Sequence, residues 1–221
     1  LASKEFGWYC RNTGYNPFTV EGKKTAAFEI WETIVLSLRK IYGKLAIFVS
    51  VGDGNIITGL HKGFKDLQAL GWLDEMPRIF GIQSEKSAAV ANAFFKGSEE
   101  IIPVRSTTIA DSISVDLPRD GVRAVRAARD TGGEYLTVTD DEIIASIADL
   151  GRVGIFAEPA GSAAYAGLKK AIQLTKITPE DPVLVINTGS GLKDIRAAVM
   201  AVPEAPVIEP SMKALKAYLG M

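Results

Sequence analysis

The sequence is short of two residue types on which much protein chemistry depends. It has one cysteine, Cys10, and one histidine, His61, among 221 residues. A single cysteine excludes an internal disulfide framework and a cysteine-ligated metal cluster, and it is typical of a reducing compartment. A single histidine excludes a multi-histidine metal site, so we expect no metal site. It leaves one candidate for a histidine-containing catalytic triad, and no G-x-S-x-G motif accompanies it.

Charge of one sign and long apolar runs are also lacking. Lys and Arg total 25 against 26 Asp and Glu, so no net positive field favours nucleic acid. No uninterrupted apolar run approaches the roughly 20 residues that span a bilayer. The start, LASKEFGWYCRN, lacks the basic and apolar segments of a signal peptide. We therefore expect a cytoplasmic protein with no nucleic-acid partner and no membrane partner.

The sequence does contain a regular alternation of short apolar runs and amphipathic segments. Hydrophobic residues make up 47% of the chain, enough for a sizeable core. Strands alternating with helices of roughly 10–15 residues indicate parallel βαβ units. The predicted fold class is therefore α/β, with an open, mostly parallel sheet and helices on both faces. Strands are predicted at residues 44–51, 77–84, 133–139, 153–159 and 181–189. Helices are predicted at residues 21–40, from the turn after the first strand to about 70, and at 84–97, 120–132, 140–151, 160–174, 191–202 and 213–220.

Composition divides the chain into two unequal parts. Residues 1–20 are rich in Gly, Asn, Tyr and Pro and predict an irregular lead-in, whereas residues 21–221 predict one large α/β domain. Residues 97–118 are less regular than the rest, and we interpret them as a lid or a dimer-facing loop.

A glycine-rich turn follows the first predicted strand. Gly52, Asp53, Gly54 and Asn55 stand between that strand and a predicted helix. Glycines let the backbone approach a ligand closely, and the start of a helix offers unpaired N–H groups that suit phosphate. The turn is not a nucleotide P-loop, because it lacks the G-x-x-x-x-G-K-[ST] spacing, and it fails G-x-G-x-x-G because position 57 is Ile. An ordinary strand-to-helix turn is the alternative interpretation.

Two other loops follow predicted strands at the same edge of the sheet. NTGSGLKD includes Thr188, whose hydroxyl could bond a ring nitrogen, although a structural turn is equally compatible with the sequence. Glu158 ends the predicted strand 153–159, and a carboxylate there is expected to face a polar site. His61 lies about one turn into the helix after the glycine turn, where a solvated or capping role is expected.

Five stretches together resemble one family. They are YNPFTVEGKKTAAFEI, VSVGDGNIITGLHKGFKDL, FGIQSEKSAAVANAF, AEPAGSAAYAG and VLVINTGSGLKD. In this order they resemble the threonine synthases, members of the fold-type-II pyridoxal 5'-phosphate (PLP) enzymes that share the tryptophan synthase β-like fold. The resemblance extends from about Phe6 to about Ala201.

The resemblance implies a cofactor and the residues that hold it. The backbone N–H groups of the glycine turn would bind the PLP phosphate, Thr188 would bond the pyridine nitrogen, and Glu158 would border the ring. The implied reaction converts O-phosphohomoserine and water into threonine and phosphate. The residues implied for the phosphate are Gly52, Asp53, Gly54, Asn55 and Ile56.

The chain departs from the family at its start. The family's Schiff-base lysine lies in a segment of the type Ser-Phe-Lys-Asp, and Lys23, Lys24 and Lys193 lie in no such setting. The resemblance therefore implies a C-terminal portion whose large domain is incomplete and which contains no catalytic residue. We expect it to be inactive alone, and to need the missing N-terminal segment within a homodimeric full-length protein. Two alternatives stay open, namely a related PLP enzyme (cysteate synthase or threonine dehydratase) and a non-catalytic α/β module that binds a phosphorylated metabolite.

Overall fold

A parallel sheet forms the centre of the computed structural model, which describes residues 1–35 and 45–221. The strand order in the described residues is β3-β2-β1-β4, and each neighbouring pair is parallel. This arrangement confirms the predicted α/β class. The strands are β1 (Ala46–Ser50), β2 (Arg78–Ser84), β3 (Tyr135–Val138) and β4 (Val183–Val185).

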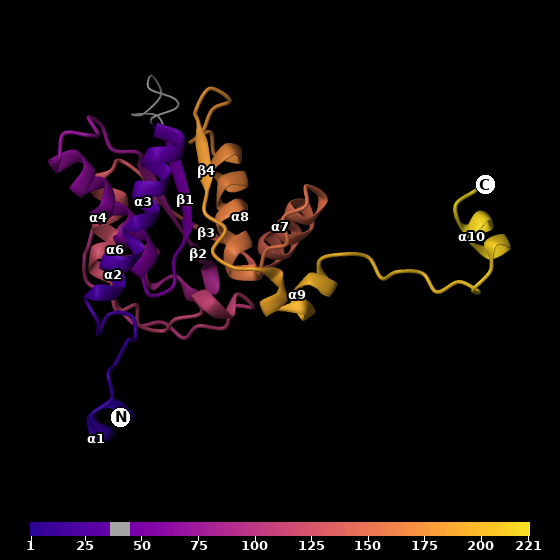
Figure 1. Ribbon diagram of the computed structural model, residues 1–221, viewed down its shortest axis with the longest axis horizontal. Helices are drawn as coiled ribbons and strands as arrows, with labels where there is room; N and C mark the ends of the chain where they lie inside the picture. Colours follow the sequence, from indigo (N-terminus) through magenta and orange to yellow (C-terminus); the bar gives the residue numbers. More distant parts are fainter. Residues whose placement is uncertain (36–44) are drawn as a thin grey trace.

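Helices cover both faces of this sheet (Figure 1). All five residues of β1 are buried, as expected for a strand between two helical layers. Two hydrophobic cores result, one on each face of the sheet. The core on one face includes residues of α3 (Thr25–Ile30), α4 (Asn55–Ala69), α5 (Ala89–Phe95) and α6 (Gly121–Asp130), and the core on the other includes residues of α7 (Asp140–Arg152) and α8 (Pro159–Gln173). Helix α2 (Phe18–Lys23) packs on α4.

The helix predicted over residues 21–40 consists of several pieces. Helix α2 begins at Phe18, before the predicted boundary at residue 21, and α3 continues into a π-helix, η1 (Trp31–Val35). The prediction for residues 36–40 lies outside the described residues. A Cβ on Gly63 would lie 2.5 Å from the Lys24 carbonyl oxygen. The glycine therefore allows the α2–α3 segment to pack directly on α4.

The strand predicted over residues 153–159 is wrong. Within this segment no strand forms, and one antiparallel bridge joins Ala157 to Ser190. Two backbone hydrogen bonds flank the bridge, from Gly191 N to Phe156 O at 2.9 Å and from Glu158 N to Gly189 O at 3.1 Å. The segment thus pairs with the loop after β4, not with a strand of the sheet, and the pairing ends after two bonds. The prediction took the apolar residues of this segment to be buried, but Val153 is 71% exposed.

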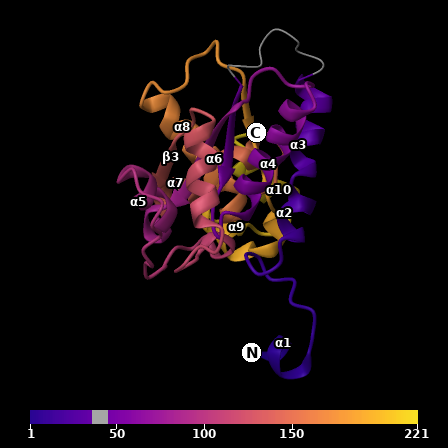
Figure 2. The same cartoon turned by 90° about the vertical axis from the view of Figure 1, so that its left-hand side faces the viewer.

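Both ends of the chain project from the domain. Figure 2 shows α1 (Ala2–Phe6), which lies within the predicted lead-in, well away from the sheet. In Figure 1, α10 (Met212–Tyr218) stands at the end of an extended segment that follows α9 (Ile195–Met200). Among residues 1–35 and 45–221, no helix combines the length and the apolar character needed to cross a membrane.

Candidate functional site

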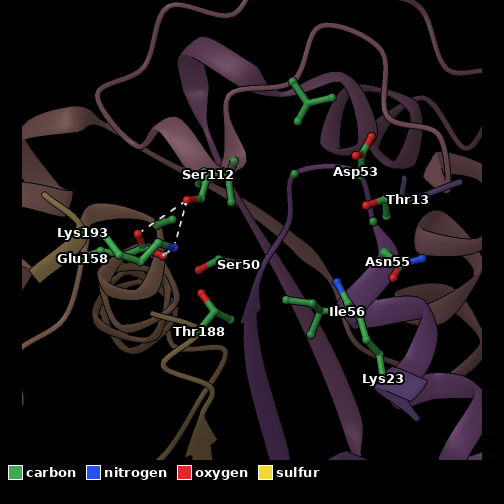
Figure 3. Close-up of a pocket in the computed structure, with 15 residues that line it drawn as sticks. Thr13, Lys23, Ser50, Asp53, Asn55, Ile56, Ser112, Glu158, Thr188 and Lys193 are labelled. Carbon is green, nitrogen blue, oxygen red and sulfur yellow. Dashed lines mark hydrogen bonds and ion pairs between the residues drawn. The ribbon is translucent and has the colours of Figure 1, made fainter. Parts of the chain in front are cut away.

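The predicted site residues meet at the carboxyl edge of the sheet. Strands β1 and β4 are parallel neighbours, so the loops that follow them emerge side by side. With the start of α8 and the 3₁₀ turn η4 (Asp111–Ile113), these loops line a cavity of about 200 Å³ (Figure 3). All the residues predicted to hold a ligand line this cavity: Gly52, Asp53, Gly54, Asn55, Ile56, Glu158 and Thr188.

A side chain would be crowded at two positions of the glycine turn after β1. A Cβ on Gly52 would lie 3.0 Å from the Ile113 Cα, and one on Gly54 would lie 2.7 Å from the Ala124 Cβ. Gly54 also has a φ of +88°, which disfavours other residue types. The first intrahelical bond of α4 runs from Thr58 N to Gly54 O at 3.1 Å. The three preceding N–H groups therefore have no acceptor within the helix, and they suit an anion.

Two side chains of this turn hold it in place. The Asp53 carboxylate accepts a hydrogen bond from Arg119 N at 3.1 Å, and its carbonyl accepts one from Asp120 N at 2.9 Å. The Asn55 side-chain amide donates to the Asp120 carboxylate. These contacts anchor the turn to the segment before α6. Because the two side chains are engaged there, the groups that the turn offers to a ligand are its backbone amides.

Two hydroxyl groups line the cavity between β1 and β4. Figure 3 shows the side chains of Ser50 and Thr188 directed toward one another. Ser50 is 4% exposed, and its hydroxyl has no hydrogen-bond partner among the residues that the structure describes. An unpaired buried hydroxyl is costly, and a polar group of a ligand in this part of the site would relieve that cost.

An ion pair between a buried carboxylate and an exposed ammonium closes the cavity on the α8 side. Glu158 is 5% exposed, and the Lys193 ammonium lies 2.7 Å from its Oε1. Ser112 Oγ lies 3.5 Å from both the Glu158 Oε2 and the Lys193 Nζ. A Cβ on Gly189 would lie 2.0 Å from the Glu158 Oε1, so any other residue there would displace the carboxylate. Lys193 neutralises a charge that would otherwise be buried alone.

Several cavity residues were not predicted from the sequence as ligand-binding residues. Lys23, Ser50, Ser112 and Lys193 line the cavity together with the predicted residues. Ser112 belongs to the irregular segment 97–118, so the absence of regular structure was its only signal. Ser50, a polar residue at the end of an apolar strand, could have been noticed.

The expectation of a solvated or capping role for His61 is wrong. This side chain is 8% exposed, and its Nε2 has no hydrogen-bond partner within the described part of the chain. Burial lowers the pKa of His61, and the Asp130 carboxylate, 3.8 Å from Nε2, partly opposes this. His61 lies on the side of α4 that faces α6, near Asp130 at the end of that helix, and packing there buries most of the ring. The described residues contain no group of three His, Cys, Asp or Glu side chains that could hold a metal ion.

Comparisons with known proteins agree with this geometry. The sequence profile of the family described as "Pyridoxal-phosphate dependent enzyme" matches residues 1–189. The chain is 37% identical to threonine synthase of Methanocaldococcus jannaschii over 206 residues, which cover 92% of this chain and 50% of that protein. It is 33% identical to threonine synthase of Mycobacterium tuberculosis over 207 residues, 93% of this chain and 54% of that protein. The chain thus spans about half the length of the curated relatives it matches.

Solved structures share the fold at lower identity. Threonine deaminase isoform 2 of Solanum lycopersicum superposes with a TM-score of 0.70 and 22% identity, over 90% of this chain and 51% of that chain. Maize serine racemase superposes with a TM-score of 0.64 and 19% identity, over 90% of this chain and 56% of that chain. The chain belongs to the pyridoxal-phosphate dependent enzymes, and its fold is that of fold type II.

The cavity fits the cofactor of this family. PLP combines a phosphate monoester with an aromatic ring that carries polar substituents. The Gly52 and Gly54 positions, which a Cβ would fill, leave the backbone bare at the start of α4. The buried Ser50 hydroxyl adds a polar group in need of a partner. Bare amides and an unpaired hydroxyl in one cavity are what a small phosphorylated ring requires.

Proposed function

We propose that this chain supplies the PLP site of an enzyme that converts O-phosphohomoserine and water into threonine and phosphate. The observation that carries the proposal is the meeting of the glycine turn, Thr188 and Glu158 in one cavity. The identity of 33–37% to threonine synthases, over more than 90% of the chain, favours this reaction.

In this proposal each end of the coenzyme has its own partner. The backbone N–H groups of residues 52–56 hold the phosphate, and the Thr188 hydroxyl bonds the pyridine nitrogen. Bound PLP supplies an electron sink for substrate carbanions. A hydroxyl partner is neutral, so it leaves the ring nitrogen largely unprotonated and favours elimination and replacement over transamination.

Glu158 borders the coenzyme ring without competing for its nitrogen. Its carboxylate is already paired with Lys193 at 2.7 Å. The pair presents no net charge to the ring, and the neutral Thr188 hydroxyl is left as the partner of the nitrogen.

A lysine that carries the coenzyme covalently is also needed. None of Lys23, Lys24 and Lys193 lies in the family's motif for that lysine. We propose that a segment outside these 221 residues supplies it, that the chain alone does not turn over substrate, and that the whole protein is a homodimer.

The test is an assay of the whole protein that contains this chain. We expect O-phosphohomoserine to yield equal amounts of threonine and phosphate, dependent on added PLP. Release of ammonia and a 2-oxo acid from threonine instead would indicate a dehydratase. Tight binding of phosphate compounds with no turnover of any amino acid would indicate the non-catalytic module.

A further inference from the structure

One cation in the cavity has no direct partner. Lys23, the last residue of α2, directs its ammonium group into the cavity beside Ile56 (Figure 3). In residues 1–35 and 45–221, no hydrogen bond or ion pair engages this ammonium. The cavity's other lysine, Lys193, is paired with Glu158. Lys23 is therefore the cation that remains available to a ligand in the described cavity.

Helix packing fixes the position of this lysine. A Cβ on Gly59 would lie 2.8 Å from the Lys23 Cβ and 3.0 Å from its carbonyl carbon. The end of α2 therefore packs directly on α4, one helical turn after Asn55. That turn is about 5.4 Å long, which a lysine side chain can span. The packing thus brings the ammonium to the first turn of α4, where the unpaired amides lie.

The surroundings of Lys23 leave its charge without a contact partner. Burial lowers the pKa of Lys23, and the more distant charges of Asp120 and Asp53 partly oppose this. Asp53 is engaged by Arg119 N, and Asp120 forms an ion pair with Arg123. A half-buried ammonium without a contact partner is unfavourable, and an anionic ligand at the same place would relieve that cost.

We infer that Lys23 binds the phosphate monoester held by the glycine turn, an inference that rests on the proposed function. The ammonium adds a charge-assisted hydrogen bond to those of the backbone amides. A further group of the cavity wall points to a ligand. The Ser50 Oγ is buried and has no partner within the described residues, and its O–H can donate to a phosphate oxygen. The phosphate is that of the coenzyme or that of a phosphorylated substrate.

The neighbouring lysine provides a matched control. Lys24 lies 2.8 Å from the Asp66 carboxylate and 2.9 Å from that of Glu21, and it does not line the cavity. Lys24→Met removes the same charge from the same helix end, away from the proposed ligand.

The experiment measures ligand affinity by titration calorimetry, with the full chain in wild-type, Lys23→Met, Lys23→Gln and Lys24→Met forms. PLP is compared with pyridoxal, which lacks the phosphate, and inorganic phosphate is titrated separately. In the whole protein saturated with PLP, O-phosphohomoserine is compared with homoserine. We expect both Lys23 variants to bind phosphate, and one of the two phosphorylated ligands, about 10- to 100-fold more weakly than wild type. Affinity for the ligands without phosphate, and all affinities of Lys24→Met, stay unchanged.

The outcomes separate the two proposals. Loss with PLP assigns Lys23 to the coenzyme phosphate, and loss with O-phosphohomoserine assigns it to the substrate phosphate. If wild type binds PLP and the Lys23 variants bind every ligand equally well, the inference on Lys23 is wrong and the proposed function stands. Equal weakening toward PLP and pyridoxal, or covalent trapping of PLP on Lys23 by borohydride, also overturns it. A wild-type chain that binds neither PLP nor phosphate contradicts both proposals.

Discussion

At Gly54 the backbone φ is +88°, and an added Cβ would lie 2.7 Å from the Ala124 Cβ. Gly71 has a similar φ of +71°, but an added Cβ there would meet no described atom within 4 Å. Alanine at Gly71 would therefore introduce backbone strain alone, whereas alanine at Gly54 would add a steric clash to that strain. We expect Gly71→Ala to lower the free energy of unfolding by about 1 kcal/mol, and Gly54→Ala by about 2–4 kcal/mol.

Urea unfolding of both variants measures this difference. Gly54→Ala should also weaken PLP binding, because the turn that presents the amides must shift, whereas Gly71→Ala should not. Equal losses of stability in the two variants would show that Ala124 does not restrict the turn.

His61 is the single histidine of the chain, so its titration can be followed without assignment. Burial holds its folded-state pKa below the ordinary value of 6.5. The unfolded chain therefore binds this proton more readily, so His61's contribution to stability is complete above pH 6.5 and is lost as pH falls from 6.5 toward the folded-state pKa. We expect an NMR titration of the ring proton to give a midpoint below 6.5. A midpoint above that of a histidine in an unfolded peptide would contradict the burial seen here.

For single residues, the sequence predicted which residues of the site meet but not the direction of their side chains. Parallel strands bring their carboxyl ends together, so Thr188 and the glycine turn were expected at one edge. The direction of the Asp53 and Asn55 side chains depends on Arg119 and Asp120, which lie about 65 positions further along the chain. No local pattern contains that information, and the inward direction of Lys23 likewise depends on packing against α4.

Among the elements, α4 and α8 formed where amphipathic patterns predicted them, because each buries one apolar face on the sheet. The predicted strand at residues 153–159 failed for a related reason. An apolar run indicates burial, but the neighbour that pairs with it decides between strand and loop. Here the neighbour is the turn at Gly189 and Gly191, whose direction permits one bridge.

The ion pair between Glu158 and Lys193 joins the start of α8 to the 3₁₀ turn η5 (Gly191–Lys193). Lys193→Met leaves the carboxylate buried with the Ser112 hydroxyl as a distant partner. We expect a loss of about 1–3 kcal/mol, less than for a fully buried pair because the Lys193 side chain is 56% exposed.

A double-mutant cycle measures this coupling. Adding Glu158→Gln to Lys193→Met removes the unpaired charge, so the double variant should lose less stability than the sum of the single variants. Strictly additive losses in urea unfolding would mean that the two side chains do not interact.

Considered as a whole, the molecule is a sheet between two helical layers with a C-terminal extension. None of the described residues of α10 is buried, and Val207 before it is 99% exposed. Deleting residues 202–221 should therefore change the free energy of unfolding by less than about 0.5 kcal/mol.

Unfolding and light scattering of this truncated chain test the independence of the extension. Deletion of residues 213–221 alone is the control for α10. A loss above about 1 kcal/mol, or a fall in the molecular mass of an assembly, would show that the extension packs on another chain.

A crystal structure of the chain soaked with PLP tests the central claim most directly. The account predicts the phosphate within hydrogen-bond distance of the backbone amides of residues 52–56, with the ring nitrogen beside the Thr188 hydroxyl. PLP ordered elsewhere on the chain, or a ring whose nitrogen faces away from Thr188, would contradict it.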